Sequence, residues 1–223
     1  MFIHGGYWRA PSRVESRFAA TGLVPAGGSL ATLDHALAAE VSISEMTRQC
    51  RATLADMWHN AETLAIDRRR IVVTGGSAGG HLAAMLMVAG WRAGFGLPDD
   101  AVAGGLPVSG RFDLSPIARR FVQEWNGLSA RDVAALSPLS HLPAPGYRAM
   151  VAWDDTEPTG FGRQSRAFHQ AWAAAGQPVG VLELAGRDHF DAVLELADGD
   201  RALFRALMSP IPARPARRRT AQP

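Results

Sequence analysis

Short apolar runs alternate with longer amphipathic stretches along this chain, and several of the runs end in glycine. The clearest is the β-branched segment RIVVTGG, which predicts a buried strand that stops at its two glycines. Further strands are expected at Phe2-Ile3, weakly over residues 29–34, and in the segments AVAGGLPVSG, YRAMVAW and PVGVLEL. Strands that alternate with helical stretches are typical of an α/β fold with a mainly parallel sheet.

Helical periodicity fills the intervals between the strands. The expected helices cover residues 14–20, 44–64, 77–89, 161–175 and 191–207. The buried face of the longest is expected to consist of Met46, Cys50, Leu54, Met57 and Leu64. Residues 111–145 include several Pro and Ser, so we expect an irregular excursion with short helices there, which could form a cap over a pocket.

The composition indicates one globular domain. The chain has 223 residues, 47% of them hydrophobic, and we expect one domain over residues 1–210 and a flexible Arg/Pro-rich tail over 211–223. There is no apolar run of about 18 residues and no signal-peptide pattern, so no membrane segment is expected. The single cysteine, Cys50, cannot form an internal disulfide, which favours a reducing, cytoplasmic location. The net charge is +2 without a basic stripe, which argues against a nucleic-acid partner; a homodimer is left open.

The segment TGGSAGGHLAAML follows the clearest strand and opens a helix. Within it, residues 75–79 fit the pattern G-x-S-x-G, in which a serine sits on a tight strand-to-helix turn with its hydroxyl projecting above the sheet. Ser77 is therefore a candidate nucleophile. The alternative is a glycine-rich phosphate-binding turn, but the chain has no lysine and no G-x-G-x-x-G spacing.

The segment FIHGGYW near the start of the chain fits the second requirement of a serine nucleophile, which is a set of donors for the oxyanion. Gly5 and Gly6 have no side chains to block a substrate carbonyl from their N–H groups, and Ala78 supplies the N–H after the nucleophile. We expect the preceding histidine to brace this loop and an aromatic pocket wall to come from Tyr7 and Trp8.

The base and the acid are expected after the last two strands, because an α/β-hydrolase triad runs in the order Ser, acid, His. His189 follows the last predicted strand and is the candidate base. The loop DDTEPTGF after the preceding strand offers Asp154, Asp155 and Glu157, and position alone does not choose among them. Asp188, beside the base, is expected either to be solvated or to brace the loop. The remaining histidines after the nucleophile are expected to be structural: His81, His141 and His169.

Six segments together resemble the kynurenine formamidase (arylformamidase) branch of the α/β-hydrolases, which is close to the hormone-sensitive-lipase-like esterases. They are HGGYWR, GGSAGGHLAAM, VSGRFDLSPI, SPLSHLP, EPTGFGRQSRAF and GRDHFDAVLEL, and they span nearly the whole chain in order. In that family the acid stands four residues before a Phe that precedes R-Q-S. The resemblance therefore selects Glu157 as the acid, with Asp154 and Asp155 in reserve.

The resemblance also implies an activity. It points to a serine hydrolase that cleaves N-formyl-L-kynurenine to L-kynurenine and formate in tryptophan catabolism, through an acyl-serine intermediate and without a metal or cofactor. Trp125 would join Tyr7 and Trp8 as a wall for the aromatic leaving group. The alternatives are a small-ester carboxylesterase and an inactive, truncated remnant.

Three departures from the family pattern stand out. The nucleophile turn reads Gly-Gly-Ser where the family commonly has Gly-His-Ser, and TLDHALAAEVSISEM replaces a segment of the type N-Y-R-L-A-P-E. Relatives also carry further strands before HGG, so the sheet is expected to lack its first two edge strands and to expose residues 31–34 as an edge. Because the catalytic residues look intact, we expect a start codon further upstream rather than a degraded copy.

Overall fold

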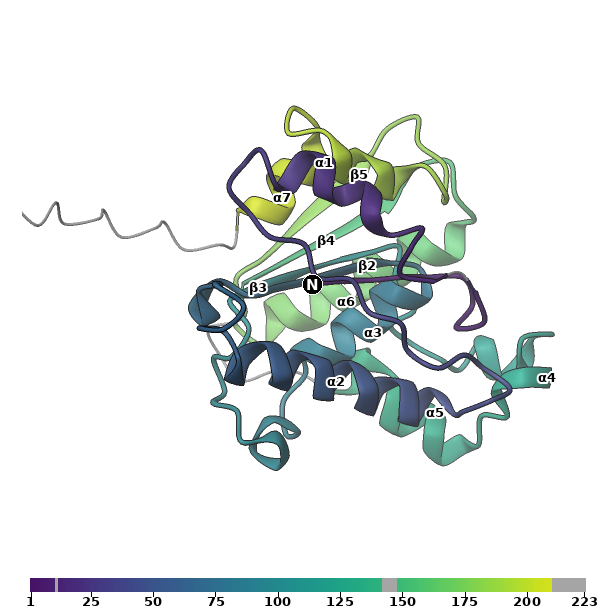
Figure 1. Cartoon of the computed structure of the whole chain (residues 1–223). Coiled ribbons are helices and arrows are strands. Elements are labelled where there is room, and N and C mark those ends of the chain that lie inside the picture. The colour runs from purple at the N-terminus through teal and green to yellow at the C-terminus, as the bar shows by residue number, and fades with distance from the viewer. Residues whose placement is uncertain (11, 142–147, 210–223) are drawn as a thin grey trace, which may run out of the picture.

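Five parallel strands form a single sheet in the computed structural model, which describes residues 1–10, 12–141 and 148–209 (Figure 1). The strand order is β1-β2-β3-β4-β5, so each strand pairs with the next one along the chain. The strands are β1 Phe2–Ile3, β2 Val72–Gly76, β3 Gly104–Val108, β4 Arg148–Asp154 and β5 Val179–Leu184. The predicted parallel sheet is confirmed.

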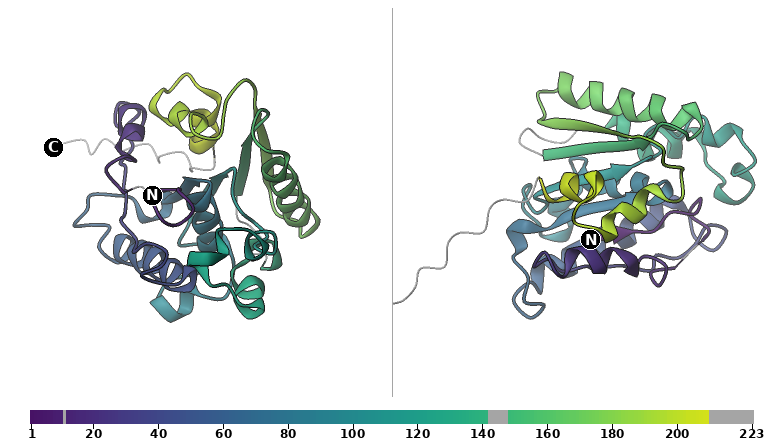
Figure 2. Two further views of the ribbon diagram at one scale, coloured as in Figure 1. Left: turned by 90° about the vertical axis from the view of Figure 1, so that its right-hand side faces the viewer. Right: turned by 90° about the horizontal axis from the view of Figure 1, so that it is seen from above.

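Helices cover both faces of this sheet (Figures 1 and 2). The α-helices are α1 Ala20–Leu23, α2 Ile43–His59, α3 Ala78–Met87, α4 Gln123–Asn126, α5 Ala130–Leu136, α6 Thr159–Ala174 and α7 Ala202–Met208. The 3-10 helices are η1 Arg17–Ala19, η2 Arg68–Arg70, η3 Arg92–Phe95, η4 Ile117–Arg119, η5 Pro138–Ser140 and η6 Ala192–Ala197. No helix among the described residues is both long and apolar enough to cross a membrane.

Two hydrophobic clusters lie on opposite faces of the sheet. Because successive strand side chains point to opposite faces, Phe2 and Val72 enter one cluster while Ile3 and Val73 enter the other. The first cluster packs the sheet against α1, η6 and α7, and the second packs it against α2, α3 and α6. The molecule is therefore three layers thick, with the sheet in the middle (Figure 2).

The longest helix, α2, begins where the side chain of Ser42 accepts a hydrogen bond from the N–H of Glu45 at 3.2 Å. Its buried face includes Met46, Cys50 and Leu54, as predicted. Burial raises the pKa of the Cys50 thiol to about 12, which fits the structural role expected for this residue. Leu64 does not share that face, because the helix ends at His59 and leaves Leu64 49% exposed.

Three other predicted elements differ from the structure. The weak strand at residues 29–34 is only a single bridge between Phe2 and Thr32, because β1 is two residues long and offers little to pair with. The helix expected at 14–20 begins at Arg17 and runs through η1 and α1 to Leu23. The helix expected at 191–207 is two helices, η6 and α7, which the Asp-Gly-Asp turn at residues 198–200 separates.

The excursion after β3 consists of short helices, as predicted for residues 111–141. It contacts the loop after β1, where the ring of Tyr7 lies 6.0 Å from that of Phe121 and the guanidinium of Arg9 lies 4.9 Å from the ring of Trp125. Residues 142–145 of the predicted excursion and the predicted tail at 211–223 lie outside the described residues.

His81 joins three segments at the centre of the molecule. Its buried ring lies on α3, where Nδ1 accepts a hydrogen bond from the indole N–H of Trp8 at 3.3 Å and Nε2 donates to the carbonyl of Leu136 at 2.8 Å. These two bonds fix a neutral tautomer. Burial lowers the pKa of His81 to about 4. The structural role expected for His81 is thus a bridge from the β1 loop to the end of α5.

Gly79 allows α3 to pack directly against the end of β1. A Cβ at this position would lie 2.0 Å from the carbonyl oxygen of Ile3 and 2.6 Å from that of His4, and both atoms belong to the backbone. We predict that Gly79→Ala lowers the free energy of unfolding by about 3 kcal/mol or more, because the strand or the helix must move. Chemical denaturation measures this change. Gly94→Ala is the control, since no atom lies within 4 Å of its Cβ position, and equal effects would contradict the prediction.

His81 also predicts how stability depends on pH. The unfolded chain takes up a proton at this residue near pH 6.5, whereas the native state resists it until about pH 4. Stability is therefore lost as the pH falls between those values, by about 2 kcal/mol between pH 7 and pH 5. In urea titrations at both pH values, His81→Gln should lose less stability on acidification than the wild type. Exposed His59→Gln is the control, and parallel losses in all three proteins would contradict the assignment.

Candidate active site

The predicted site segments all follow the carboxyl ends of the five parallel strands. This edge of a parallel sheet is where ligands bind in open α/β folds, because the loops from neighbouring strands meet there. The β1 loop brings the paired glycines, β2 leads into Ser77, and β3 leads into Ser109. The loop after β4, which we call the acid loop (residues 155–158), and the loop after β5, which we call the base loop (residues 185–191), complete the edge.

Ser77 occupies the strained turn that the sequence predicts. Its backbone has φ 56° and ψ −117°, a conformation that costs a non-glycine residue on the order of 1–3 kcal/mol. Its N–H donates to the carbonyl of Val108 at 2.9 Å, which anchors the turn to β3. α3 begins at the next residue, Ala78, so the free N–H groups of a helix N-terminus lie beside the serine.

The paired glycines lie beside this turn. A Cβ on Gly5 would be 3.4 Å from the Cβ of Ser77 and 2.7 Å from the carbonyl oxygen of Gly76, so only glycine permits this approach. Gly6 has φ +74°, and its carbonyl accepts hydrogen bonds from the N–H groups of Arg9 and Ala10 at 2.9 and 3.1 Å. The structure therefore brings the expected oxyanion segment against the expected nucleophile.

The two aromatic residues of this segment lie in different environments. Tyr7 is 42% exposed and lies beside Phe121. Trp8 is only 1% exposed, and its indole N–H is bound to His81, so it has no free face to serve as the pocket wall expected from the sequence. Trp125 is half-buried beneath Phe121, with the two rings 5.5 Å apart. Phe121 was not among the residues proposed from the sequence.

Glu157 and His189 form a direct pair. The Oε2 atom of Glu157 lies 2.9 Å from Nδ1 of His189, and the side chain of Glu157 is buried. With its proton on Nδ1, the imidazole keeps Nε2 free to accept a proton. Of the three acids that the sequence left open, Glu157 is the one that contacts His189. Asp155 instead accepts a hydrogen bond from the N–H of Gly186 at 2.9 Å, which supports the base loop.

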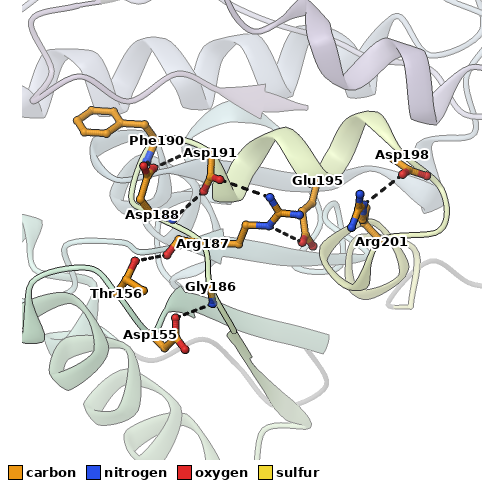
Figure 3. Close-up of polar contacts among 10 residues, drawn as sticks. All are labelled: Asp155, Thr156, Gly186, Arg187, Asp188, Phe190, Asp191, Glu195, Asp198 and Arg201. Atoms are coloured by element: carbon orange, nitrogen blue, oxygen red, sulfur yellow. Dashed lines mark hydrogen bonds and ion pairs between the residues drawn. The ribbon is translucent and has the colours of Figure 1, made fainter.

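Hydrogen bonds join the acid loop to the base loop, and further hydrogen bonds form within the base loop (Figure 3). The hydroxyl of Thr156 donates to the carbonyl of Arg187, in addition to the bond between Asp155 and Gly186. Asp188 accepts hydrogen bonds from the N–H groups of Phe190 and Asp191 at 2.8 and 2.9 Å, which confirms its expected bracing role. The position of His189 is therefore fixed by the backbone on both sides.

Ser77 and His189 are not hydrogen-bonded to each other within the described part of the chain. The base loop nevertheless reaches the nucleophile turn, because Val193, just after it, would lie 2.7 Å from a Cβ on Gly76. Catalytic hydrogen bonds are often long or misaligned in a site without substrate and tighten when substrate binds. The structure therefore forms the Glu157–His189 pair of the expected triad, and Ser77 lies on the turn that Val193 reaches.

Two further polar residues border the pair and were not singled out in the sequence. Ser109 is buried at the end of β3, and its hydroxyl lies 3.0 Å from Oε1 of Glu157. Arg111 follows it, with its guanidinium 3.6 Å from the centre of the Phe161 ring, which itself lies 4.2 Å from the ring of His189. Arg111 also contacts the hydroxyl of Tyr7. Both residues lie in the segment SGR, which directly follows a predicted strand. That position in the sequence is the signal that could have identified them.

The proximity of the acids and the base does not require a metal. Ligand atoms of Asp154, Glu157 and His189 lie within 4.8 Å of one another, which is close enough for a shared ion. Nδ1 of His189 is hydrogen-bonded to one oxygen of Glu157, and the hydroxyl of Ser109 is hydrogen-bonded to the other. Hydrogen bonding therefore accounts for this arrangement.

Known proteins of similar sequence are hydrolases. The family model BD-FAE matches residues 1–96. The kynurenine formamidase of Danio rerio is 28% identical over 216 residues, which cover 95% of this chain and 72% of that protein. The kynurenine formamidase of Drosophila melanogaster is 25% identical, covering 93% of this chain and 71% of its own.

Solved structures show the same fold. A protein of Silicibacter sp. tm1040, whose assignment as a thioesterase is itself provisional, has a TM-score of 0.78 at 27% identity, over 93% of this chain and 74% of its own. The Pyrobaculum calidifontis esterase has a TM-score of 0.76 at 17% identity, over 94% and 74% of the two chains. The expected fold is confirmed: the chain is a hydrolase enzyme of the α/β-hydrolase type, similar to the kynurenine formamidase branch.

Proposed function

We propose that this protein is a serine hydrolase that cleaves N-formyl-L-kynurenine to L-kynurenine and formate. The observation that carries the proposal is the buried hydrogen bond between Glu157 and His189, on loops that flank the strained turn of Ser77. The names of the relatives supply the substrate, because the site itself supports only acyl transfer to a serine.

The first half of the reaction forms a tetrahedral intermediate on Ser77. Nε2 of His189 takes the proton from the hydroxyl of Ser77 as its oxygen attacks the formyl carbon. Glu157 stabilises the imidazolium that results. The N–H groups of Gly5, Gly6 and Ala78 are the proposed donors to the oxyanion, and the start of α3 adds its partial positive charge.

The second half expels the amine and then formate. The imidazolium of His189 protonates the aryl nitrogen as the carbon–nitrogen bond breaks, which releases L-kynurenine. Water, deprotonated by the same imidazole, then attacks the formyl-serine and releases formate. A formyl group is small, so the acyl side of the site requires little space. The exposed rings of Tyr7 and Phe121 lie side by side, and we propose that the aromatic leaving group packs against them.

Arg111 suits the charged end of this substrate. The residue forms no ion pair with any acid in the described part of the chain, and it lies on Phe161 next to His189. Partial burial lowers the pKa of Arg111, but a guanidinium stays protonated at neutral pH. We propose that it binds the carboxylate of the amino-acid moiety, which formyl-kynurenine carries and simple esters lack.

A small-ester carboxylesterase is the second candidate. The structural neighbours named as esterases favour it, since the same acyl-serine chemistry cleaves esters more readily than amides. Comparing an aryl formamide with p-nitrophenyl acetate separates the two activities.

Release of formate from N-formyl-L-kynurenine tests the proposal directly. We expect Ser77→Ala to lower kcat by about 1,000-fold or more, and Glu157→Gln by about 100-fold, while circular dichroism shows both variants folded. Asp155→Asn, which alters the neighbouring loop contact, is the matched control and should lose much less. Full activity in Ser77→Ala would exclude the serine mechanism. A folded wild type that cleaves only esters would favour the second candidate.

Arg111 is tested by comparing charged and neutral substrates. We predict that Arg111→Gln raises KM for N-formyl-L-kynurenine about tenfold, because one charge-assisted contact is lost, and changes KM for neutral formanilide less than about twofold. Arg163→Gln, on the exposed face of α6, is the matched control. Equal changes for both substrates would show that Arg111 only supports the loop.

A further inference from the structure

A second buried acid lies behind the catalytic pair and has no part in the reaction described above. Asp154 ends β4 and is 3% exposed. Its backbone N–H donates to Oε1 of Glu157 at 3.2 Å, so the two acids share one small volume. The hydroxyl of Ser109 lies between them, 3.3 Å from Oδ2 of Asp154 and 3.0 Å from Oε1 of Glu157.

A count of protons decides how these groups are charged. A serine hydroxyl has one hydrogen and can donate to only one carboxylate, whereas two ionised acids would both need a donor. The two contacts are satisfied together only if one acid is protonated and donates to the serine oxygen. Glu157 accepts bonds from His189, Ser109 and the N–H of Asp154, so it is the ionised acid. Asp154 is then the neutral one.

The other oxygen of Asp154 also indicates that this acid is neutral. Its Oδ1 atom is buried without a hydrogen-bond partner among the described residues. An ionised carboxylate in that position would leave a charged oxygen buried without a hydrogen bond, which costs free energy. The same position costs much less for the carbonyl oxygen of a neutral acid.

We propose that Asp154 is a neutral positioning residue, and that its acid proton completes the chain Asp154–Ser109–Glu157–His189. In this chain Asp154 donates to the oxygen of Ser109, and the hydroxyl of Ser109 donates to Glu157. The fixed hydroxyl holds the carboxylate of Glu157 toward Nδ1 of His189. Ser109 has φ 47°, a strained value for a serine, which fits a side chain held in one direction by its surroundings.

The charges around Asp154 favour the neutral form. Glu157 of the acid loop and Asp188 and Asp191 of the base loop face it with negative charge, His189 lies beyond Glu157, and β3 contributes only the uncharged Ser109. Burial, followed by the charge of Glu157, raises the pKa of Asp154 to about 7. Above that pH the second negative charge would compete with Glu157 for the hydroxyl of Ser109.

Thermal stability tests the protonation state without any substrate. Because the native pKa lies above the unfolded value of 3.8, the stability from the neutral acid is complete below about pH 3.8 and is lost as the pH rises to about 7. The amide of Asp154→Asn does not ionise, so this variant does not lose stability in that way as the pH rises. We expect the melting temperature of Asp154→Asn, relative to wild type, to rise by about 3 °C or more between pH 5 and pH 8. Asp100→Asn, on an exposed turn, should show no such change.

Kinetics test the positioning role, and this part rests on the proposed function. Asp154→Ala and Ser109→Ala should each lower kcat about tenfold at pH 6.5 with little change in KM, because Glu157 loses its support. Asp154→Asn, whose amide can still donate to Ser109, should recover most of that loss. Its activity relative to wild type should also increase above pH 7.

The two measurements separate the possible failures. A melting difference for Asp154→Asn that does not depend on pH would overturn the neutral assignment, whatever the activity. If the assignment holds but Asp154→Asn is as inactive as Asp154→Ala, the positioning role is wrong. If the wild type cleaves no formamide and no ester, the proposed function fails, and the melting experiment still decides the charge of Asp154.

Discussion

The close packing of backbone against backbone, at the point where β1 and α3 cross, determines the rest of the site. A Cβ at Gly79 would collide with the carbonyls of Ile3 and His4, and a Cβ at Gly5 would collide with the carbonyl of Gly76. A side chain at either glycine would separate the two segments. Because they stay in contact, the backbone after β1 lies beside the start of α3, and these are the two segments that carry the proposed oxyanion donors. The strain at the nucleophile is compensated by this packing and by the hydrogen bond to Val108.

His81 extends the same constraint to the excursion after β3. Its neutral ring can accept from Trp8 and donate to Leu136 only in one tautomer, so a single residue fixes the β1 loop and the end of α5 relative to α3. Tyr7 of the β1 loop also contacts Phe121, which lies earlier in the same excursion. The buried histidine four residues after Ser77 thus has a structural role in this region.

Much of this arrangement could be predicted from the sequence, because it depends on local pattern. The strands follow from apolar runs, and Ser77, Glu157 and His189 follow from their places after strands, together with the family resemblance for the acid. What could not be predicted depends on tertiary contacts. Tyr7 and Trp8 are neighbours that both have a positive φ, yet Tyr7 is exposed and Trp8 is buried against a helix far away in the sequence. The break in the last predicted helix could not be predicted either, because the apolar periodicity of the sequence continues across the turn that separates η6 from α7.

The buried acids show why a site needs more than its three named residues. Glu157 is held by a hydroxyl from β3, a backbone N–H from β4 and an imidazole from the base loop, so three strands converge on one carboxylate. A second acid can be tolerated there only without its charge, since two ionised carboxylates would repel and share one donor. The proton on Asp154 and the charge on Glu157 therefore depend on each other. In the proposed arrangement a neutral Asp154 allows Glu157 to keep its charge, although Asp154 is not hydrogen-bonded to His189.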